Sequence, residues 1–386
     1  MRTRSLSGAA FLAALLTAST AAADSMDPAL GRLVLENSCR APRGDGQGEF
    51  YEPSSGFVRC EPNHAAFAKL VAQMGFALAP VAAHPARTTG FGGYRIALEG
   101  SYTTIDSDAP YWSQGTQGPK ASDKNQFSVN NPSPDGVLQV YALKLAKGFP
   151  FGVELGASFG YLVNSTLVAG GGDVRIALFE GFRESVPGFF PDIAVGGGVR
   201  TIAGTSEIKL TVASLDTQIS KPIPIAGTVS LHPHVGYQWI RIFGDAGLVD
   251  LTPNTNPLSL CNYVGDNTPA TPQGGAPFDA QPVCDGGSSA DFNNTLVFNR
   301  TRLTRHRINF GMQLRYQMLH FGVHVITDAV STAKANADEV LVRDVREDPN
   351  KATSISINNF ADDPRTPEND EVGKQLTVAI ELGALF

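Results

Sequence analysis

Apolar and polar residues alternate with a period of two through much of the chain, which is typical of strands that have one apolar and one polar face. The clearest stretch is RINFGMQLRYQM, residues 307–318, in which every second residue is apolar and the others are polar or glycine. The same alternation continues to the last residue of the sequence, over 376–386. This pattern predicts an all-β fold.

Ten such segments begin at Phe91, and most are about ten residues or longer, the length that a tilted strand needs to cross a bilayer. Aromatic residues recur near their ends, as they do in the interfacial girdles of membrane barrels. The predicted strands lie at roughly 91–105, 135–147, 151–163, 172–182, 192–204, 206–219, 226–243, 296–318, 320–329 and 373–386.

The lengths of the connections distinguish a membrane barrel from a water-soluble sandwich. Connections after even-numbered segments are short, whereas three of those after odd-numbered segments are long, at 106–134, 244–295 and 330–372. Membrane barrels have short periplasmic turns and longer external loops, but a sandwich has no reason to place its long loops at one end. The sequence therefore predicts a transmembrane antiparallel up-and-down β-barrel of about ten strands, or twelve if a long loop contains a hairpin. An even strand number places both ends of the barrel in the periplasm.

The first 88 residues do not show this alternation. Residues 1–23 contain two arginines, a short apolar run and then small residues, which predicts a secretory signal peptide cleaved after Ala23. Residues 24–88 form a separate N-terminal segment before the barrel at 89–386, with a short helix predicted near 64–76. Two placements fit this segment: a plug inside the barrel, or a helix under the periplasmic rim.

Composition narrows the class of protein. Charged residues make up only 17% of the chain, and the mean hydropathy of −0.07 is too polar for a helical membrane protein. A formal net charge of −7 gives no support to nucleic-acid binding. Four cysteines in an exported chain indicate two disulfides, and we expect the pairs Cys39–Cys60 and Cys261–Cys284 because each closes a local loop.

The last strand carries a resemblance to a known class of proteins. Its alternating apolar residues and terminal phenylalanine resemble the C-terminal strand of Gram-negative outer-membrane β-barrel proteins, although Ala384 stands where many members have an aromatic residue. The resemblance implies a cell outer-membrane location, outer-membrane lipid and lipopolysaccharide as surroundings, and the barrel-assembly machinery as a partner during biogenesis. We expect a monomer. The residues to which the resemblance gives the role of an assembly signal are Leu376, Val378, Ile380, Leu382 and Phe386.

Charged and polar residues fall on the strand faces opposite lipid, where they would line the lumen. A charge on the lipid face costs about 2–4 kcal/mol at the midplane, which supports this assignment of faces. More arginines than carboxylates in the lumen would favour anions; the alternative is a salt-bridged interior whose side chains fill the bore. The predicted lumen-lining residues are Arg95, Glu99, Lys144, Glu154, Arg175, Arg200, Lys209, His232, His234, Arg307, Gln313, Arg315, His320, His324 and Glu381.

Two histidine pairs raise the question of a metal or catalytic site. His232 and His234 share one strand face, and so do His320 and His324. Same-face pairs arise often by chance, so we expect neither a metal ion nor another cofactor. Ser230 shares the face of His232, as in a Ser/His nucleophile pair, but no orienting carboxylate is visible in the sequence. We therefore do not expect an enzyme.

The predicted function is a narrow channel or transporter for small solutes, its interior tuned by the lumenal arginines. One alternative is a non-conducting structural or surface-recognition barrel that works through its external loops. The other alternative is a membrane-embedded lipid hydrolase.

Overall fold

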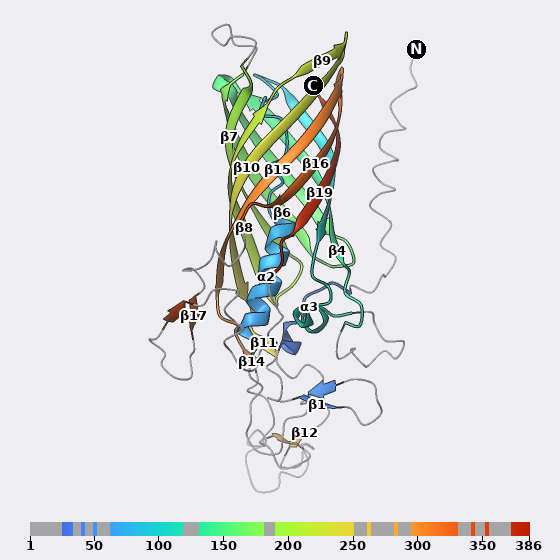
Figure 1. Ribbon diagram of the computed structural model, residues 1–386. Helices are drawn as coiled ribbons and strands as arrows, with labels where there is room; N and C mark the ends of the chain where they lie inside the picture. The colour runs from blue at the N-terminus through green and yellow to red at the C-terminus, as the bar shows by residue number, and fades with distance from the viewer. Residues whose placement is uncertain are drawn as a thin grey trace, which may run out of the picture.

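The molecule is an antiparallel sheet closed into a cylinder (Figure 1). The computed structural model describes residues 25–33, 40–42, 49–51, 62–118, 131–180, 190–250, 261–263, 282–284, 295–330, 341–343, 352–354 and 372–386. Ten strands form the wall, and each is hydrogen-bonded to a strand on both sides. In ring order they are β3 (Tyr94–Thr104), β4 (Val137–Phe149), β5 (Val153–Leu162), β6 (Val168–Phe179), β7 (Asp192–Ala203), β8 (Ile208–Ser220), β10 (Val229–Ala246), β15 (Thr301–Tyr316), β16 (Leu319–Asp328) and β19 (Leu376–Leu385).

Shorter elements lie outside this ring. Strand β9 (Ile223–Ala226) pairs only with the start of β10. Two helices, α2 (His64–Leu78) and α3 (Pro110–Gly115), and two 3₁₀ turns, η1 (Leu30–Arg32) and η2 (Pro150–Gly152), complete the regular structure around it. Four two-stranded pairs are separate from the wall: β1 (Arg40–Pro42) with β2 (Glu49–Tyr51), β11 (Val249–Asp250) with β14 (Thr295–Leu296), β12 (Cys261–Tyr263) with β13 (Pro282–Cys284), and β17 (Leu341–Arg343) with β18 (Ala352–Ser354).

The wall has the ten strands predicted from the alternation, and the hairpins described in the long connections do not enlarge it to twelve. Observed strand ends differ from the predicted ones by a few residues. No helix among the described residues has the length and apolar character needed to span a membrane.

The last strand closes the cylinder by pairing with the first. In β19, Leu382 lies opposite Leu98 of β3, and Ile380 lies opposite Gly100. Beyond the strand ends, Tyr94 and Phe386 exchange two backbone hydrogen bonds of 3.0 and 2.9 Å. An unpaired strand edge is not tolerated in lipid because its N–H and C=O groups have no other partner there. The pairing of β19 with β3 removes that edge.

The two ends of the barrel differ in their connections. At one end the turns are short, such as Pro150–Gly152 between β4 and β5 and the Gln317–Met318 turn between β15 and β16. The long connections 105–136, 247–300 and 329–375 all leave from the other end. Short turns face the periplasm in outer-membrane barrels, so the end with Phe386, uppermost in Figure 1, is periplasmic and the long-loop end is external.

The outer surface carries a belt of exposed apolar side chains. Leu215 is 61% exposed, Phe310 52% and Leu382 58%, and they lie on three different strands of the wall. A water-soluble protein does not expose apolar residues so continuously. Tyr102, Tyr141 and other aromatic residues lie toward the ends of this belt. The hydroxyl groups of Tyr102 and Tyr141 are 3.1 Å apart. The belt is the surface that lipid covers.

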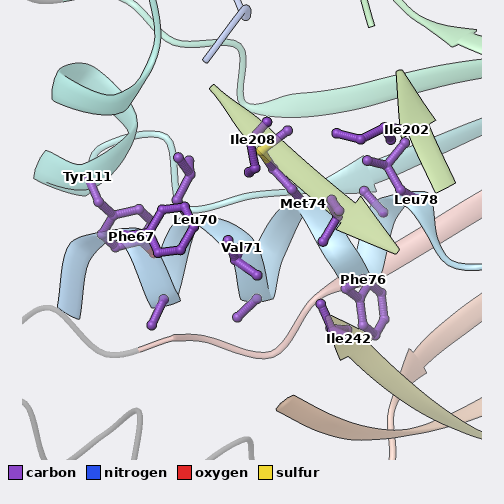
Figure 2. Close-up of a cluster of buried hydrophobic side chains, with 14 of the residues drawn as sticks. Phe67, Leu70, Val71, Met74, Phe76, Leu78, Tyr111, Ile202, Ile208 and Ile242 are labelled. Atoms are coloured by element: carbon purple, nitrogen blue, oxygen red, sulfur yellow. The ribbon is translucent and has the colours of Figure 1, made fainter. Parts of the chain in front are cut away.

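Helix α2 occupies the external half of the barrel interior. Asn63 caps its first turn by accepting a hydrogen bond of 2.9 Å from the backbone N–H of Ala66. Every residue from Ala65 to Leu78 is buried, so the helix is covered on all sides and not along a single stripe. Figure 2 shows Phe67, Leu70, Val71 and Met74 among side chains of the surrounding wall and of α3, including Ile208, Ile242 and Tyr111.

Two glycines allow α2 to approach β10 closely. A Cβ atom at Gly75 of the helix would lie 2.5 Å from Cγ2 of Ile242, and one at Gly244 of the strand would lie 2.5 Å from Cγ1 of Val71. Neither position has room for a side chain unless the helix moves away from the wall.

We expect Gly75→Val to lower the free energy of unfolding by about 1–3 kcal/mol, because the added methyl groups overpack the contact with Ile242. Urea unfolding of the refolded protein in lipid vesicles measures this change. The control is Gly170→Val on the outer face of β6, where a Cβ atom meets nothing within 4 Å. Equal effects of the two substitutions would contradict the packing of α2 against β10.

Candidate functional site: the filled lumen

The lumen has an apolar external half and a polar periplasmic half. The inward-facing residue type changes along single strands: β8 passes from Ile208, Leu210 and Val212 to Asp216 and Gln218 toward the periplasm. On β10 the inward residues pass from Ile242 and Ile240 to Gln238, His234 and His232. The apolar half surrounds α2, because an apolar helix can only be buried against apolar walls.

This change of polarity places Lys209 differently from the prediction. The structure puts Lys209 on the exposed outer face of β8, while its neighbours Ile208 and Leu210 are each 1% exposed and face inward. The expectation of a lumenal Lys209 was wrong because it assumed a polar lumen along the whole strand. The helix reverses that polarity at the external end.

The other predicted lumen residues point inward from the wall. They are Arg95, Glu99, Lys144, Glu154, Arg175, Arg200, His232, His234, Arg307, Gln313, Arg315, His320, His324 and Glu381. The outer face of β19 carries Leu376, Val378, Ile380 and Leu382, and Phe386 follows the strand at the periplasmic rim.

Two arginines of β15 hold the C-terminal half of α2. Arg307 donates to the carbonyl oxygens of Phe76 at 3.1 Å and Pro80 at 2.8 Å, and Arg305 donates to that of Ala72 at 3.2 Å. Their guanidinium groups lie 5.1 and 4.4 Å from the centre of the Phe76 ring. Carbonyl groups at a helix C-terminus lack helical partners and carry partial negative charge. The arginines therefore act as a C-terminal anchor for the helix.

A buried ion pair fixes this anchor. Arg305 donates to both carboxylate oxygens of Asp328 at the end of β16, with distances of 3.0 and 2.5 Å. Gln375 contacts the same carboxylate through its backbone N–H at 2.9 Å. Neither Arg305 nor Asp328 was selected from the sequence, although Arg305 shares the face of Arg307 and extending the alternation by two residues would have found it.

Residues 79–93 continue from α2 through the polar half of the lumen and lead into β3 at the periplasmic end. Lumenal side chains satisfy their backbone. The N–H of Ala86 donates to Ser220 Oγ at 2.9 Å, that of Thr88 to Glu180 Oε1 at 2.8 Å, and that of Thr89 to Glu154 Oε2 at 2.8 Å. Irregular backbone is tolerated at membrane depth only when the protein or water supplies such partners.

Several of the charges around this segment are paired with one another, whereas Nη1 of Arg200 and Nε of Arg315 have no hydrogen-bond partner among the described residues. Glu154 lies between Arg95 and Arg175, at 3.4 and 3.3 Å. Lys144 contacts Glu99 and, at 3.7 Å, Glu381, which also accepts from His320 Nε2 at 2.9 Å. This part of the lumen is therefore a salt-bridged interior filled by side chains. It corresponds to the alternative that the sequence left open beside an anion-selective lining.

Two of the histidines, His234 and His324, contact each other, and no third metal-ligating side chain joins them among the described residues. Nε2 of His234 and Nδ1 of His324 are 3.1 Å apart. Ser230 Oγ lies 2.9 Å from His232 Nε2, whereas Nδ1 of His232 has no hydrogen-bond partner among the described residues. Across the part of the chain that the structure describes, no group of three His, Cys, Asp or Glu side chains has metal-binding geometry.

Little space remains beside the lumenal segment. A cavity of about 30 Å³ lies between Val81, His84, Arg175, Arg200 and Asp216, which is room for about two or three water molecules.

The external mouth is closed by an external cap, which consists of residues 25–33 and α3. The N–H of Ala29 donates to the carbonyl oxygen of Gly115 at 2.8 Å, and the Asp27 carboxylate accepts from the N–H of Thr166 at 2.7 Å. On α2, Gln73 donates to the Tyr111 hydroxyl at 2.7 Å. The cap therefore joins residues that precede the helix to the external loops.

The predicted disulfides lie largely outside the described part of the chain. Cys39 and Cys60 are not among the described residues. Cys261 and Cys284 stand opposite each other in the β12–β13 pair, but their side chains are not described. The predicted signal peptide at 1–23 also lies outside the described residues.

We expect Arg305→Met to lower the free energy of unfolding by about 3–5 kcal/mol, because it leaves the buried Asp328 carboxylate unpaired. Adding Asp328→Leu should recover most of the loss, which a double-mutant cycle in lipid vesicles measures. The matched control is Arg302→Met, three residues away on the same strand, whose partner Asp245 is 36% exposed; it should cost under about 1 kcal/mol. Similar losses for both arginines would contradict the anchor.

Comparison with known proteins finds only remote structural similarities. No protein-family model and no curated protein matches the chain. Among solved structures, Ail, the attachment invasion locus protein of Yersinia pestis, is 11% identical over 77% of this chain and 99% of its own, with a TM-score of 0.21. The translocator domain of the autotransporter NalP from Neisseria meningitidis is 9% identical over 78% of this chain and 89% of its own, with a TM-score of 0.28. For the outer membrane protein OprG from Pseudomonas aeruginosa the corresponding values are 11%, 77%, 98% and 0.22.

These TM-scores lie below 0.5, so the fold rests on the strand pairing of the chain itself. The closed ten-stranded ring, its apolar belt and its unequal ends are those of an outer-membrane β-barrel protein.

Proposed function

We propose that the protein is a non-conducting outer-membrane barrel that works at the cell surface, using its lumen to hold its own N-terminal segment. In this proposal the barrel is a scaffold, and the external cap with the residues attached to it is the working surface. This is the surface-recognition alternative that the sequence raised, and it replaces the channel as the leading function.

The direction in which the chain threads the barrel carries the proposal. Residues 25–33 lie at the external mouth, α2 descends inside the wall, and residues 79–93 reach the periplasmic end where β3 begins. The N–H of Asn63 donates to the carbonyl oxygen of Leu33 at 2.8 Å. Leu33 and Asn63, which flank the stretch 34–62, therefore lie together at the external mouth.

The contacts of the lumenal segment support a permanent occupant. Its backbone groups form hydrogen bonds with the side chains of Glu154, Glu180, Ser220 and Arg307. Withdrawing the segment would leave these side chains without their partners inside the barrel. A buried polar group without a partner costs about 1–3 kcal/mol, and more if it is charged. The summed cost of these unpartnered groups opposes withdrawal of the lumenal segment from the barrel.

A gated channel is the second candidate, and one observation favours it. The periplasmic half of the lumen is lined by charged groups around a segment that is neither helix nor strand. If that segment left, the remaining bore would be polar and suited to small solutes.

We assign no catalytic role to the Ser230–His232 pair. A hydrolytic dyad needs a group that orients the histidine through its second nitrogen, and Nδ1 of His232 contacts none among the described residues.

We expect the refolded mature protein to be silent in a planar bilayer, because residues 64–93 fill the lumen. Deleting residues 24–88 should produce discrete openings, since the deletion removes α2 and most of the lumenal segment. Single-channel recording measures both. Discrete openings of the intact protein at the same rate as those of the truncated form would sink the scaffold proposal and support the channel.

We also expect an epitope inserted after Gly46 to be labelled by antibody on intact cells, because both ends of the 34–62 stretch lie at the external mouth. The same epitope inserted between Gly227 and Thr228, in the short turn before β10, should be labelled only after the outer membrane is permeabilised. Labelling of the first epitope only after permeabilisation would contradict the threading direction, whatever the conductance.

A further inference from the structure

Polar side chains gather inside the barrel where β10, β15 and β16 reach the periplasmic end, uppermost in Figure 1. The strand register makes these side chains neighbours. Arg315 lies opposite Ser230 on one side and His320 on the other, and Gln313 lies opposite His232. All of them belong to the inward face of the wall. We call this group the periplasmic cluster and define it as Ser230, His232, Gln313, Arg315 and His320.

Four members of the periplasmic cluster each have a buried polar atom without a hydrogen-bond partner among the described residues. These atoms are Nε of Arg315, Oε1 of Gln313, and Nδ1 of His232 and of His320. His232 is 2% exposed, and Gln313 and His320 are each 1% exposed. Folded proteins leave few buried polar atoms unsatisfied. Four of them at adjacent register positions therefore indicate a shared partner from outside the chain.

Arg315 is the cation of this cluster, and it has no carboxylate of its own. The two carboxylates that act on it electrostatically are those of Glu154 and Asp192. Glu154 forms an ion pair with Arg95 at 3.4 Å, and Asp192 forms one with Arg87 at 3.2 Å. Arg315 forms no ion pair with a described residue. Because a charge inside a protein is costly unless it is paired, this guanidinium calls for an anion.

Ser230 and His232 provide a further donor in either arrangement of their hydrogens. Ser230 Oγ lies 2.9 Å from Nε2 of His232. When the hydroxyl donates, a neutral imidazole carries its hydrogen on Nδ1, which has no partner among the described residues. When Nε2 donates instead, the serine hydroxyl keeps its own hydrogen for another acceptor. The cluster thus offers this donor in addition to the N–H groups of Arg315.

An oxyanion matches this set of groups better than water or a metal ion does. Water satisfies hydrogen bonds but leaves the guanidinium of Arg315 without a counter-ion, and a metal cation would be repelled by it. A guanidinium presents its N–H groups as a planar fork that binds two oxygens of one anion. Arg315 is half-buried and lies two residues before the Gln317–Met318 turn, so a solute reaches it from the periplasmic end without passing α2.

We propose that the periplasmic cluster binds a small tetrahedral oxyanion, phosphate or sulfate, with Arg315 as its main ligand and the Ser230–His232 pair as a further donor. The anion enters from the periplasm and links β10 and β15 at that end of the barrel. This site is independent of the external cap, because the two lie at opposite ends of the lumen.

The test is the affinity of the refolded mature protein for inorganic phosphate in detergent micelles, measured by isothermal titration calorimetry at constant ionic strength in potassium chloride. We expect Arg315→Gln to weaken phosphate binding by about tenfold or more, because it removes charge-assisted hydrogen bonds. The matched control is Lys147→Gln, which removes the same charge from the outer face at the same end of the barrel, where Lys147 donates to the Tyr94 hydroxyl. The affinity of this control should equal that of the parent. Equal affinity of the parent and Arg315→Gln would overturn the proposal.

Unfolding in urea provides a second measurement, and its first part needs no variant. A ligand that binds the folded state stabilises it. Millimolar phosphate, too dilute to act by general exclusion from the surface, should therefore raise the urea midpoint of the parent above that in potassium chloride of equal ionic strength. In phosphate-free buffer Arg315→Gln should be at least as stable as the parent, because the substitution breaks no ion pair within the described chain. An equal midpoint of the parent in the two salts, or a loss of stability in Arg315→Gln without phosphate, would also overturn the proposal.

Discussion

The need to give every backbone N–H and C=O group a partner at membrane depth governs this structure. The wall meets it by closing, so that β19 pairs with β3 and no strand edge remains in lipid. The lumenal segment meets it differently. Residues 79–93 form no regular structure, and their backbone groups depend on side chains from the wall, among them Glu154, Ser220 and Arg307. The polar half of the lumen is therefore part of the support for the chain that passes through it.

The helix imposes a second constraint, which acts on the wall around it. Because α2 is buried on all sides and mostly apolar, the inward positions at the external end of β8 and β10 are apolar too. Alternation then places the polar residues of these strand ends on the outside, beyond the belt. The same period of two thus produces a polar lumen near the periplasm and polar outer positions near the external end. Lys209 lies outside for this reason.

This organisation supports the proposal that the barrel carries a surface and does not conduct. Most of the charges that resemble a selectivity lining are engaged with one another or with the threaded chain, and the cavity beside them has room for about two or three water molecules. Three features hold α2 in one position inside the barrel. They are the cap, the anchor at Arg305 and Arg307, and the close helix–wall contact at Gly75. The described residues before the helix, 25–33, lie at the external mouth, and the long connections leave the wall at the same end.

The sequence by itself determined the wall of this barrel. Strand number, the orientation from loop lengths and the outward position of residues such as Leu382 follow from a period of two and from the cost of charge in lipid. It did not determine which inward residues meet. The pairs of Arg305 with Asp328 and of Gln73 with Tyr111 join residues 23 and 38 positions apart in the chain, and no local pattern encodes them. Tertiary structure decided that the predicted helix lies inside the cylinder, because only there is its whole surface buried. That placement in turn decided that Lys209 and Arg241 lie on the outer face of the wall.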